Sequence, residues 1–175
     1  MTTVADRVQQ NLRPIPDYPK PGILFQDITP VLRDGRLLRD VVSDMCRPFR
    51  DRDVTHVLGI EARGFILGGA VATALGAGFV PARKPGKLPW ERVTESYDLE
   101  YGSDSLEAHR DALAPGSRVL VVDDVLATGG TARAAGQLVR GFGAKLLGWS
   151  FLLEIGGLKG RERLEGGACH AVVSC

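Results

Sequence analysis

The chain has 175 residues, with 22 lysines and arginines against 21 acidic residues and a formal net charge of +1. This length predicts one domain, 1–175, with a sizeable buried core, and the charge balance lacks the basic excess of nucleic-acid or anionic-membrane proteins. Three cysteines without a C-x-x-C pair argue against a disulfide scaffold or a cysteine zinc site and favour a reducing compartment. The longest nearly apolar stretch, 65–75, is too short for a membrane-spanning helix, which needs about 20 residues. We therefore expect a cytoplasmic protein with neither nucleic-acid nor membrane partners.

The first predicted elements are a short helix and a proline-rich segment. Residues 4–12 have the apolar spacing of an amphipathic helix. Four prolines within 14–21 predict an extended, irregular stretch, because proline fixes its own backbone and restricts the residue before it. Residues 23–25 are apolar, and 27–30 predict a turn.

A strand–helix alternation begins after this segment. Asp34 can cap a helix whose apolar positions keep helical spacing up to residue 49. Residues 54–60 predict a strand, 64–75 a glycine-rich helix and 78–82 a second, short strand.

The alternation continues in the second half of the chain. Residues 83–103 show no clean periodicity, which predicts a loop or hairpin, and the following patterns indicate a strand at 118–122, a helix at 130–142 and strands at 144–153 and 170–174. Strands separated by helices require crossover connections, so the fold class is α/β with a mainly parallel sheet flanked by helices.

The most informative motif joins a strand, two acids and a small-residue loop. Val119–Val122 are four apolar residues in a row, as expected of a central parallel strand covered on both faces. Asp123 and Asp124 follow, at the carboxyl end of the strand, where ligands bind in open α/β sheets. Carboxylates can accept hydrogen bonds from a vicinal diol or hold Mg²⁺ through water. The alternative is an ordinary turn after a strand.

The loop after the acid pair has the chemistry of a phosphate-binding site. It leads directly into a predicted helix and consists of Ala127, Thr128, Gly129, Gly130 and Thr131. Free backbone N–H groups, two glycines, two hydroxyls and the helix dipole together favour an anion. No lysine follows Gly130 as in a P-loop, which disfavours a nucleotide hydrolase. Thr128 or Thr131 could instead simply cap the helix. Acids beside such a loop suggest a ribose 5-phosphate unit.

The segment 119–131 resembles the 5-phosphoribosyl-1-pyrophosphate signature of the type I phosphoribosyltransferases. The stretches 16–30, 61–65, 83–88 and 96–102 are similar to the adenine-specific members of that family, in the same order along the chain. The resemblance covers roughly residues 12 to 165. It implies a twisted, mainly parallel sheet with an N-terminal hood (1–33) for base recognition and a flexible lid loop (83–103). It also implies transfer of a phosphoribosyl group to adenine in purine salvage, Mg²⁺ carried by the donor and a homodimer.

The resemblance assigns the pyrophosphate group of the donor to two basic regions. The residues concerned are Glu61, Ala62, Arg63, Arg83, Lys84 and Lys87. An arginine can clamp a diphosphate bidentately, and the family has a cis peptide at the position of Glu61–Ala62. Arg83 and Lys87 could act within one chain or across a dimer interface. The alternatives are an Arg63 paired with neighbouring carboxylates and basic residues that are merely solvated.

Two further residue groups receive roles by resemblance. Glu100 and Tyr101 match the catalytic Leu-Glu-Tyr-Gly motif, in which a carboxylate accepts or relays the N9 proton of adenine. Leu24, Phe25 and Gln26 match the adenine-binding segment, where an aromatic ring stacks on the purine and the backbone reads its edge. Without the family, Leu24 and Phe25 would be taken as ordinary core residues. The family often has arginine at the position of Gln26.

Other functions remain as alternatives. A hypoxanthine/guanine or xanthine enzyme would differ in the base-recognition region and lack the Leu-Glu-Tyr-Gly motif. A non-enzymatic phosphoribosyl sensor that regulates transcription would carry a DNA-binding module, but the residues before the proline-rich segment show no helix-turn-helix pattern.

Overall fold

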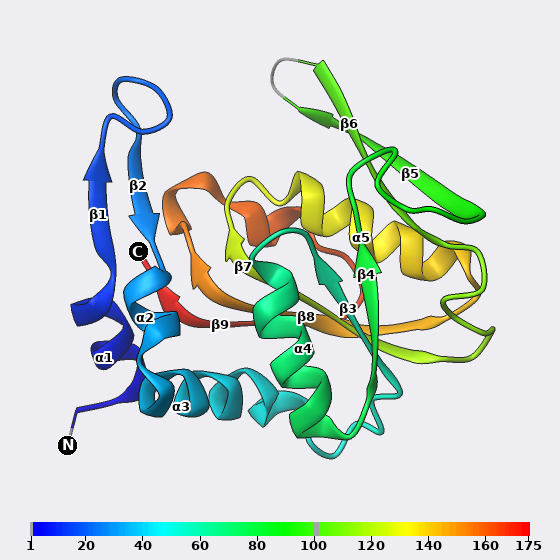
Figure 1. Cartoon of the computed structure of the whole chain (residues 1–175), viewed down its shortest axis with the longest axis horizontal. Coiled ribbons are helices and arrows are strands. Elements are labelled where there is room, and N and C mark those ends of the chain that lie inside the picture. Colours follow the sequence, from blue (N-terminus) through cyan, green and yellow to red (C-terminus); the bar gives the residue numbers. More distant parts are fainter. Residues whose placement is uncertain (1, 100–101) are drawn as a thin grey trace.

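A computed structural model describes residues 2–99 and 102–175 (Figure 1). Its centre is a five-stranded sheet in which every neighbouring pair is parallel, in the order β4-β3-β7-β8-β9. The strands are β3 (His56–Ile60), β4 (Gly78–Ala82), β7 (Arg118–Leu126), β8 (Lys145–Glu154) and β9 (Ala168–Ser174). The predicted α/β class and the parallel sheet are confirmed. Among the described residues, no helix is both long and apolar enough to cross a bilayer.

Helices cover both faces of this sheet and bury two separate apolar cores. One face packs against α5 (Gly130–Gly141), and the other against α3 (Gly35–Cys46) and α4 (Gly64–Leu75). The alternation along β7 shows why the strand is central, because Val119 and Val121 enter the α5 core while Leu120 and Val122 enter the opposite one. An apolar run of this kind needs cover on both sides.

Local signals account for most helix ends. Asp34 caps α3 by accepting hydrogen bonds from the backbone N–H groups of Arg36 and Leu37, as its position predicts. Helix α4 has its predicted bounds and ends at Gly76, whose φ of 66° suits glycine. The expected turn at 27–30 is instead the start of α2 (Thr29–Arg33), since Pro30 lies in the first turn, where its missing N–H costs nothing.

The N-terminal segment forms a unit beside the sheet. After α1 (Val4–Asn11), β1 (Arg13–Pro16) pairs antiparallel with β2 (Leu24–Asp27), and Figure 1 shows this ribbon at one end of the molecule. The proline-rich stretch was expected to be extended and irregular, and part of it is a strand. Prolines are tolerated because the sheet has only these two strands.

The second hairpin lies over α5. Strands β5 (Arg92–Leu99) and β6 (Gly102–His109) pair antiparallel, and Figure 1 shows them projecting beyond the sheet. The prediction of a loop or hairpin at 83–103 is therefore realised as a hairpin that continues to His109. Leu106 and Ala108 are fully buried in the α5 core, which anchors the hairpin. Short 3₁₀ helices at Arg47–Phe49, Gly156–Leu158 and Gly160–Arg163 complete the chain.

Candidate active site

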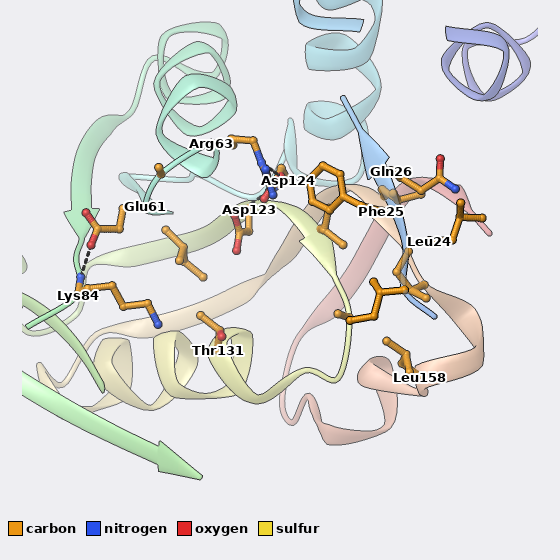
Figure 2. A pocket seen from close by; sticks show the side chains of 17 residues that line it. Leu24, Phe25, Gln26, Glu61, Arg63, Lys84, Asp123, Asp124, Thr131 and Leu158 are labelled. Atoms are coloured by element: carbon orange, nitrogen blue, oxygen red, sulfur yellow. Dashed lines mark hydrogen bonds and ion pairs between the residues drawn. The ribbon is translucent and has the colours of Figure 1, made fainter. Parts of the chain in front are cut away.

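A cavity of about 640 Å³ lies at the carboxyl ends of β3, β7 and β8. Its walls combine residues from β2, from the turn after β3 and from the segment after β8. The acid pair Asp123–Asp124 and the loop 127–131, called the phosphate-type loop below, complete them. Figure 2 shows Glu61 and Lys84 at one end, Asp123 in the middle, and Leu24 with Phe25 at the other end. The ligand edge expected from an open parallel sheet is therefore where the cavity lies.

The acid pair lies within β7, which continues past its predicted end at Val122. Asp124 is 6% exposed, and its carboxylate pairs with the Arg63 guanidinium, while its backbone N–H donates to Asp123 Oδ1 at 2.8 Å. Burial, and then the neighbouring charge of Asp124, raise the pKa of Asp123 well above the usual range for a carboxyl group. The two carboxylates therefore differ. Arg63 neutralises Asp124, whereas Asp123 can accept a proton or a hydrogen bond from a ligand.

Arg63 connects the acid pair to the hood. Besides its ion pair with Asp124, its guanidinium carbon lies 5.3 Å from the centroid of the Phe25 ring. The alternative of an arginine paired with a neighbouring carboxylate is thus present in the structure, and the diphosphate clamp stays a prediction. Arg63 also packs on an aromatic face, which lysine would do less well.

Glu61 binds residues of the basic segment 83–87 at the end of the cavity that is far from β2. Its side chain is 6% exposed and accepts from Arg83 Nε at 3.0 Å, from the Lys84 backbone N–H at 2.6 Å and from Lys87 Nζ at 3.2 Å. Burial alone would raise the pKa of Glu61, but these donors outweigh it and lower the pKa. Glu61 is therefore a charge partner of Arg83 and Lys87 that also binds the backbone of Lys84, which sequence reasoning did not foresee. The Glu61–Ala62 peptide bond is cis.

The loop 127–131 has the geometry of an anion cradle. Gly129 is the N-cap of α5 with a φ of 83°, and within the described residues α5 has no side-chain cap, so its first N–H groups can meet a ligand. The alternative of a threonine cap is not realised, because Thr131 Oγ1 donates to the Tyr97 hydroxyl at 3.2 Å. Ala127 and Thr131 both line the cavity.

The apolar end of the cavity is formed by the hood and by the segment after β8. Leu24 is 59% exposed, so it is not a core residue, and Phe25 meets the Tyr18 ring edge-on at 5.2 Å between centroids. Gln26 also lines the cavity. The opposite wall contains Leu153, Ile155 and Leu158, which sequence reasoning missed. Pairing of Val125 with Leu153 explains their place, because β8 ends beside β7.

The remaining predicted residues differ in what the structure says of them. Glu100 and Tyr101 lie outside the described residues, so their catalytic roles stay predictions. Thr128 and Gly130 belong to the loop but are not in contact with the main cavity, whereas Ala62 lines it.

The acidic residues fit a divalent cation that is shared with a ligand. Within the described part of the chain, no group of three or more histidine, cysteine or acidic side chains is arranged to hold a metal ion. Asp123 and Asp124 supply at most two carboxylates, and Mg²⁺ commonly completes its shell with water and substrate phosphates. These residues therefore suit an ion that arrives with a phosphorylated ligand.

Comparison with known proteins adds independent findings. Residues 35–163 match the phosphoribosyl transferase domain family. An adenine phosphoribosyltransferase of Myxococcus xanthus is 58% identical over 163 residues, which cover 93% of this chain and 89% of the relative. The solved structure of adenine phosphoribosyltransferase from Rhodothermus marinus is 50% identical, with a TM-score of 0.95 and 98% of each chain covered. A Trypanosoma brucei enzyme of the same name, in complex with AMP, pyrophosphate and ribose-5-phosphate, is 25% identical with a TM-score of 0.88, covering 98% of this chain and 79% of that one.

Proposed function

Because the chain belongs to the phosphoribosyl transferase family, we propose that it transfers the 5-phosphoribosyl group of 5-phosphoribosyl-1-pyrophosphate to adenine, giving AMP and pyrophosphate. This is a purine-salvage reaction of the pentosyltransferase class. The curated relatives that support this proposal match the present chain over nearly its whole length, so the proposal does not depend on one motif.

The order of groups along the cavity is the observation that carries the proposal. Lys84 and Glu61, which pairs with Arg83 and Lys87, lie at one end, the acid pair and Thr131 lie between, and the Leu24–Gln26 strand lies at the other (Figure 2). The donor and its acceptor have the same order of chemistry, namely pyrophosphate, phosphorylated ribose and an apolar, flat base. A site of this kind positions both reactants before the sugar bond changes.

Departure of pyrophosphate leaves oxocarbenium-like character at the sugar carbon. Negative charge grows on the leaving group, where Arg63, Arg83, Lys84 and Lys87 would neutralise it. Asp123 and Asp124 would accept from the ribose hydroxyls, and the Ala127–Thr131 backbone would hold the 5-phosphate. Mg²⁺ bound to the donor would add positive charge at the pyrophosphate, with Asp123 and Asp124 as its water-bridged contacts.

Adenine would bind against Phe25, on which the purine can stack. The backbone of Leu24–Gln26 would read its exocyclic amine and N1, so glutamine at position 26 is compatible with recognition through the main chain. Glu100, with Tyr101 beside it, would accept or relay the N9 proton as the new bond forms.

Base specificity is tested by following pyrophosphate release with adenine, hypoxanthine, guanine and orotate in turn. Turnover with adenine alone supports the assignment. Activity with hypoxanthine but none with adenine would replace it by the alternative purine specificity, and no turnover with any base would refute the enzymatic function.

We also propose that the active form is a homodimer in the cytoplasm. Ile66, Phe79 and Trp90 are 52%, 38% and 53% exposed, and β4, which carries Phe79, is an edge of the sheet. An edge strand and exposed large apolar side chains each favour contact with another chain. Sedimentation at working concentration tests this, and a monomer with full activity would exclude it.

A further inference from the structure

The Tyr97 hydroxyl joins three parts of the site. Tyr97 lies on β5 and is 8% exposed. Its hydroxyl accepts from Lys84 Nζ at 2.6 Å and from Thr131 Oγ1 at 3.2 Å, and it donates to Asp104 Oδ2 at 3.1 Å. A phenol offers one donor and two acceptor positions, so all of its hydrogen-bonding capacity is used.

Lys84 is held at both of its ends. Its backbone N–H is fixed by Glu61, and its ammonium group contacts both Tyr97 and the Asp104 carboxylate of β6. Burial alone would lower the pKa of Lys84, but the bonds to Asp104 and Tyr97 outweigh burial and raise it. The side chain therefore stays charged and in one place at the cavity wall.

Thr131 supplies the second connection. It lies in the first turn of α5 and lines the same cavity as Lys84, at the phosphate-type loop (Figure 2). Because Tyr97 bonds to both side chains, the pyrophosphate end and the 5-phosphate end are linked through one hydroxyl on the hairpin.

We propose that Tyr97, supported by Asp104, is a positioning residue that sets Lys84 and Thr131 at a fixed separation for the two anionic groups of the donor. The inference rests on the proposed function, since it assigns those groups to a phosphoribosyl donor. It predicts that the hydroxyl serves donor binding, whereas the ring serves the core beside α5. The two roles can be separated, because phenylalanine keeps the ring.

The test combines Tyr97→Phe with Lys84→Met in the full-length chain. Tyr97→Phe is expected to raise the KM for the donor roughly five- to twenty-fold, as loss of a hydrogen bond to a charged group would, with the KM for adenine and the Tm nearly unchanged. In the Lys84→Met background the same change is expected to have at most about a two-fold effect, because the 2.6 Å bond to the ammonium is the shortest of the three. Asp104→Asn is expected to act in the same direction as Tyr97→Phe. Asp111→Asn is the matched control, because this exposed acid lies just beyond β6 and outside the cavity.

Three outcomes would overturn the inference: an unchanged donor KM, an undiminished effect of Tyr97→Phe in the Lys84→Met background, or a lowered Tm together with equal rises in the KM for the donor and the KM for adenine. Calorimetric binding of pyrophosphate alone separates this inference from the proposed function, since it needs no base. If the native chain makes no AMP yet Tyr97→Phe weakens pyrophosphate binding, the function is wrong and the positioning role stands. If Tyr97→Phe makes AMP at the native rate and binds pyrophosphate as tightly as the native chain, the function stands and the positioning role is wrong.

Discussion

Gly129 and Gly160 meet backbone to backbone, so closely that neither position has room for a side chain. A Cβ on Gly129 would lie 2.4 Å from the carbonyl oxygen of Gly160, and one on Gly160 would lie 2.1 Å from the carbonyl oxygen of Ala127. The 3₁₀ segment that carries Gly160 is itself fixed, because Arg161 makes a two-pronged ion pair with Glu154 at the end of β8. The phosphate-type loop therefore rests on the segment after β8.

Replacing Gly160 by alanine is expected to push the loop out of place. A methyl group 2.1 Å from a backbone oxygen cannot be accommodated without a shift of the chain. We expect the KM for the phosphoribosyl donor to rise about ten-fold or more, since small displacements at such sites are costly. Gly157→Ala is the matched control, because nothing lies within 4 Å of its Cβ position. Equal kinetics for the two variants would contradict this packing.

Asp123→Asn is expected to stabilise the fold while weakening donor binding. The folded-state pKa of Asp123 is raised, mainly by burial, so the ionised carboxylate costs folding free energy at neutral pH. Removing that charge should raise the Tm, by about 2–4 °C for each kcal/mol released. Loss of the charged acceptor should lower kcat/KM for the donor roughly ten- to a hundred-fold.

The stability gain of Asp123→Asn should depend on pH in one direction. Above the raised folded-state pKa the native carboxylate is ionised and the variant is the more stable protein. As the pH falls through that pKa the native side chain takes up a proton, so the difference in Tm should shrink. Thermal unfolding of both proteins from about pH 4, near the ordinary pKa of an aspartate, up to about pH 9 measures this. A difference that grows on acidification would refute the assigned cause.

Glu61→Gln is expected to destabilise the fold, the opposite of the effect expected for Asp123→Asn. The folded-state pKa of Glu61 is lowered, so its ionised form stabilises the fold above the unfolded pKa of about 4.3 and this contribution is lost as the pH falls. Because Arg83 and Lys87 are partly exposed, we expect a loss of about 0.5–1 kcal/mol at neutral pH by urea unfolding. Glu91→Gln, whose pair with Arg110 is more than half exposed on both sides, should change stability less. Equal losses would mean that burial of Glu61 is unimportant.

Glu100→Gln tests the proton-transfer role. A positioned carboxylate contributes roughly 10²- to 10⁴-fold, so kcat should fall by about that factor with little change in Tm. Glu95→Gln is a control on the same hairpin, because Glu95 lies outside the cavity. Full turnover by a folded Glu100→Gln protein would rule out this assignment.

The sequence predicted most of the fold because local signals and the tertiary packing agree. The Asp34 cap and the apolar run of β7 each act within a few residues and each has its predicted consequence. The prediction of a turn at 27–30 was wrong for a local reason, because proline can either end a helix or begin one.

The candidate site was less predictable where contacts join distant segments. The resemblance placed Glu61 at the pyrophosphate group, but its hydrogen-bond partners come from a stretch more than 20 residues later, which no local pattern indicates. The links of Tyr97 to Lys84 and Thr131, and the contact of Gly160 with the phosphate-type loop, depend on how the hairpin and the last 3₁₀ helices pack, which no local pattern encodes.

The separation of the hood from the ends of β3 and β7 has a consequence for how such a chain can diversify. Residues that would recognise the base lie on a two-stranded ribbon, whereas those that would handle the sugar and phosphates lie on the central sheet and its loops. Substitutions at Leu24 or Gln26, away from the Phe25 ring that packs on Arg63, would thus change the preferred nucleobase and leave the proposed sugar and phosphate contacts in place. Recognition and chemistry are free to evolve at different rates within one small protein.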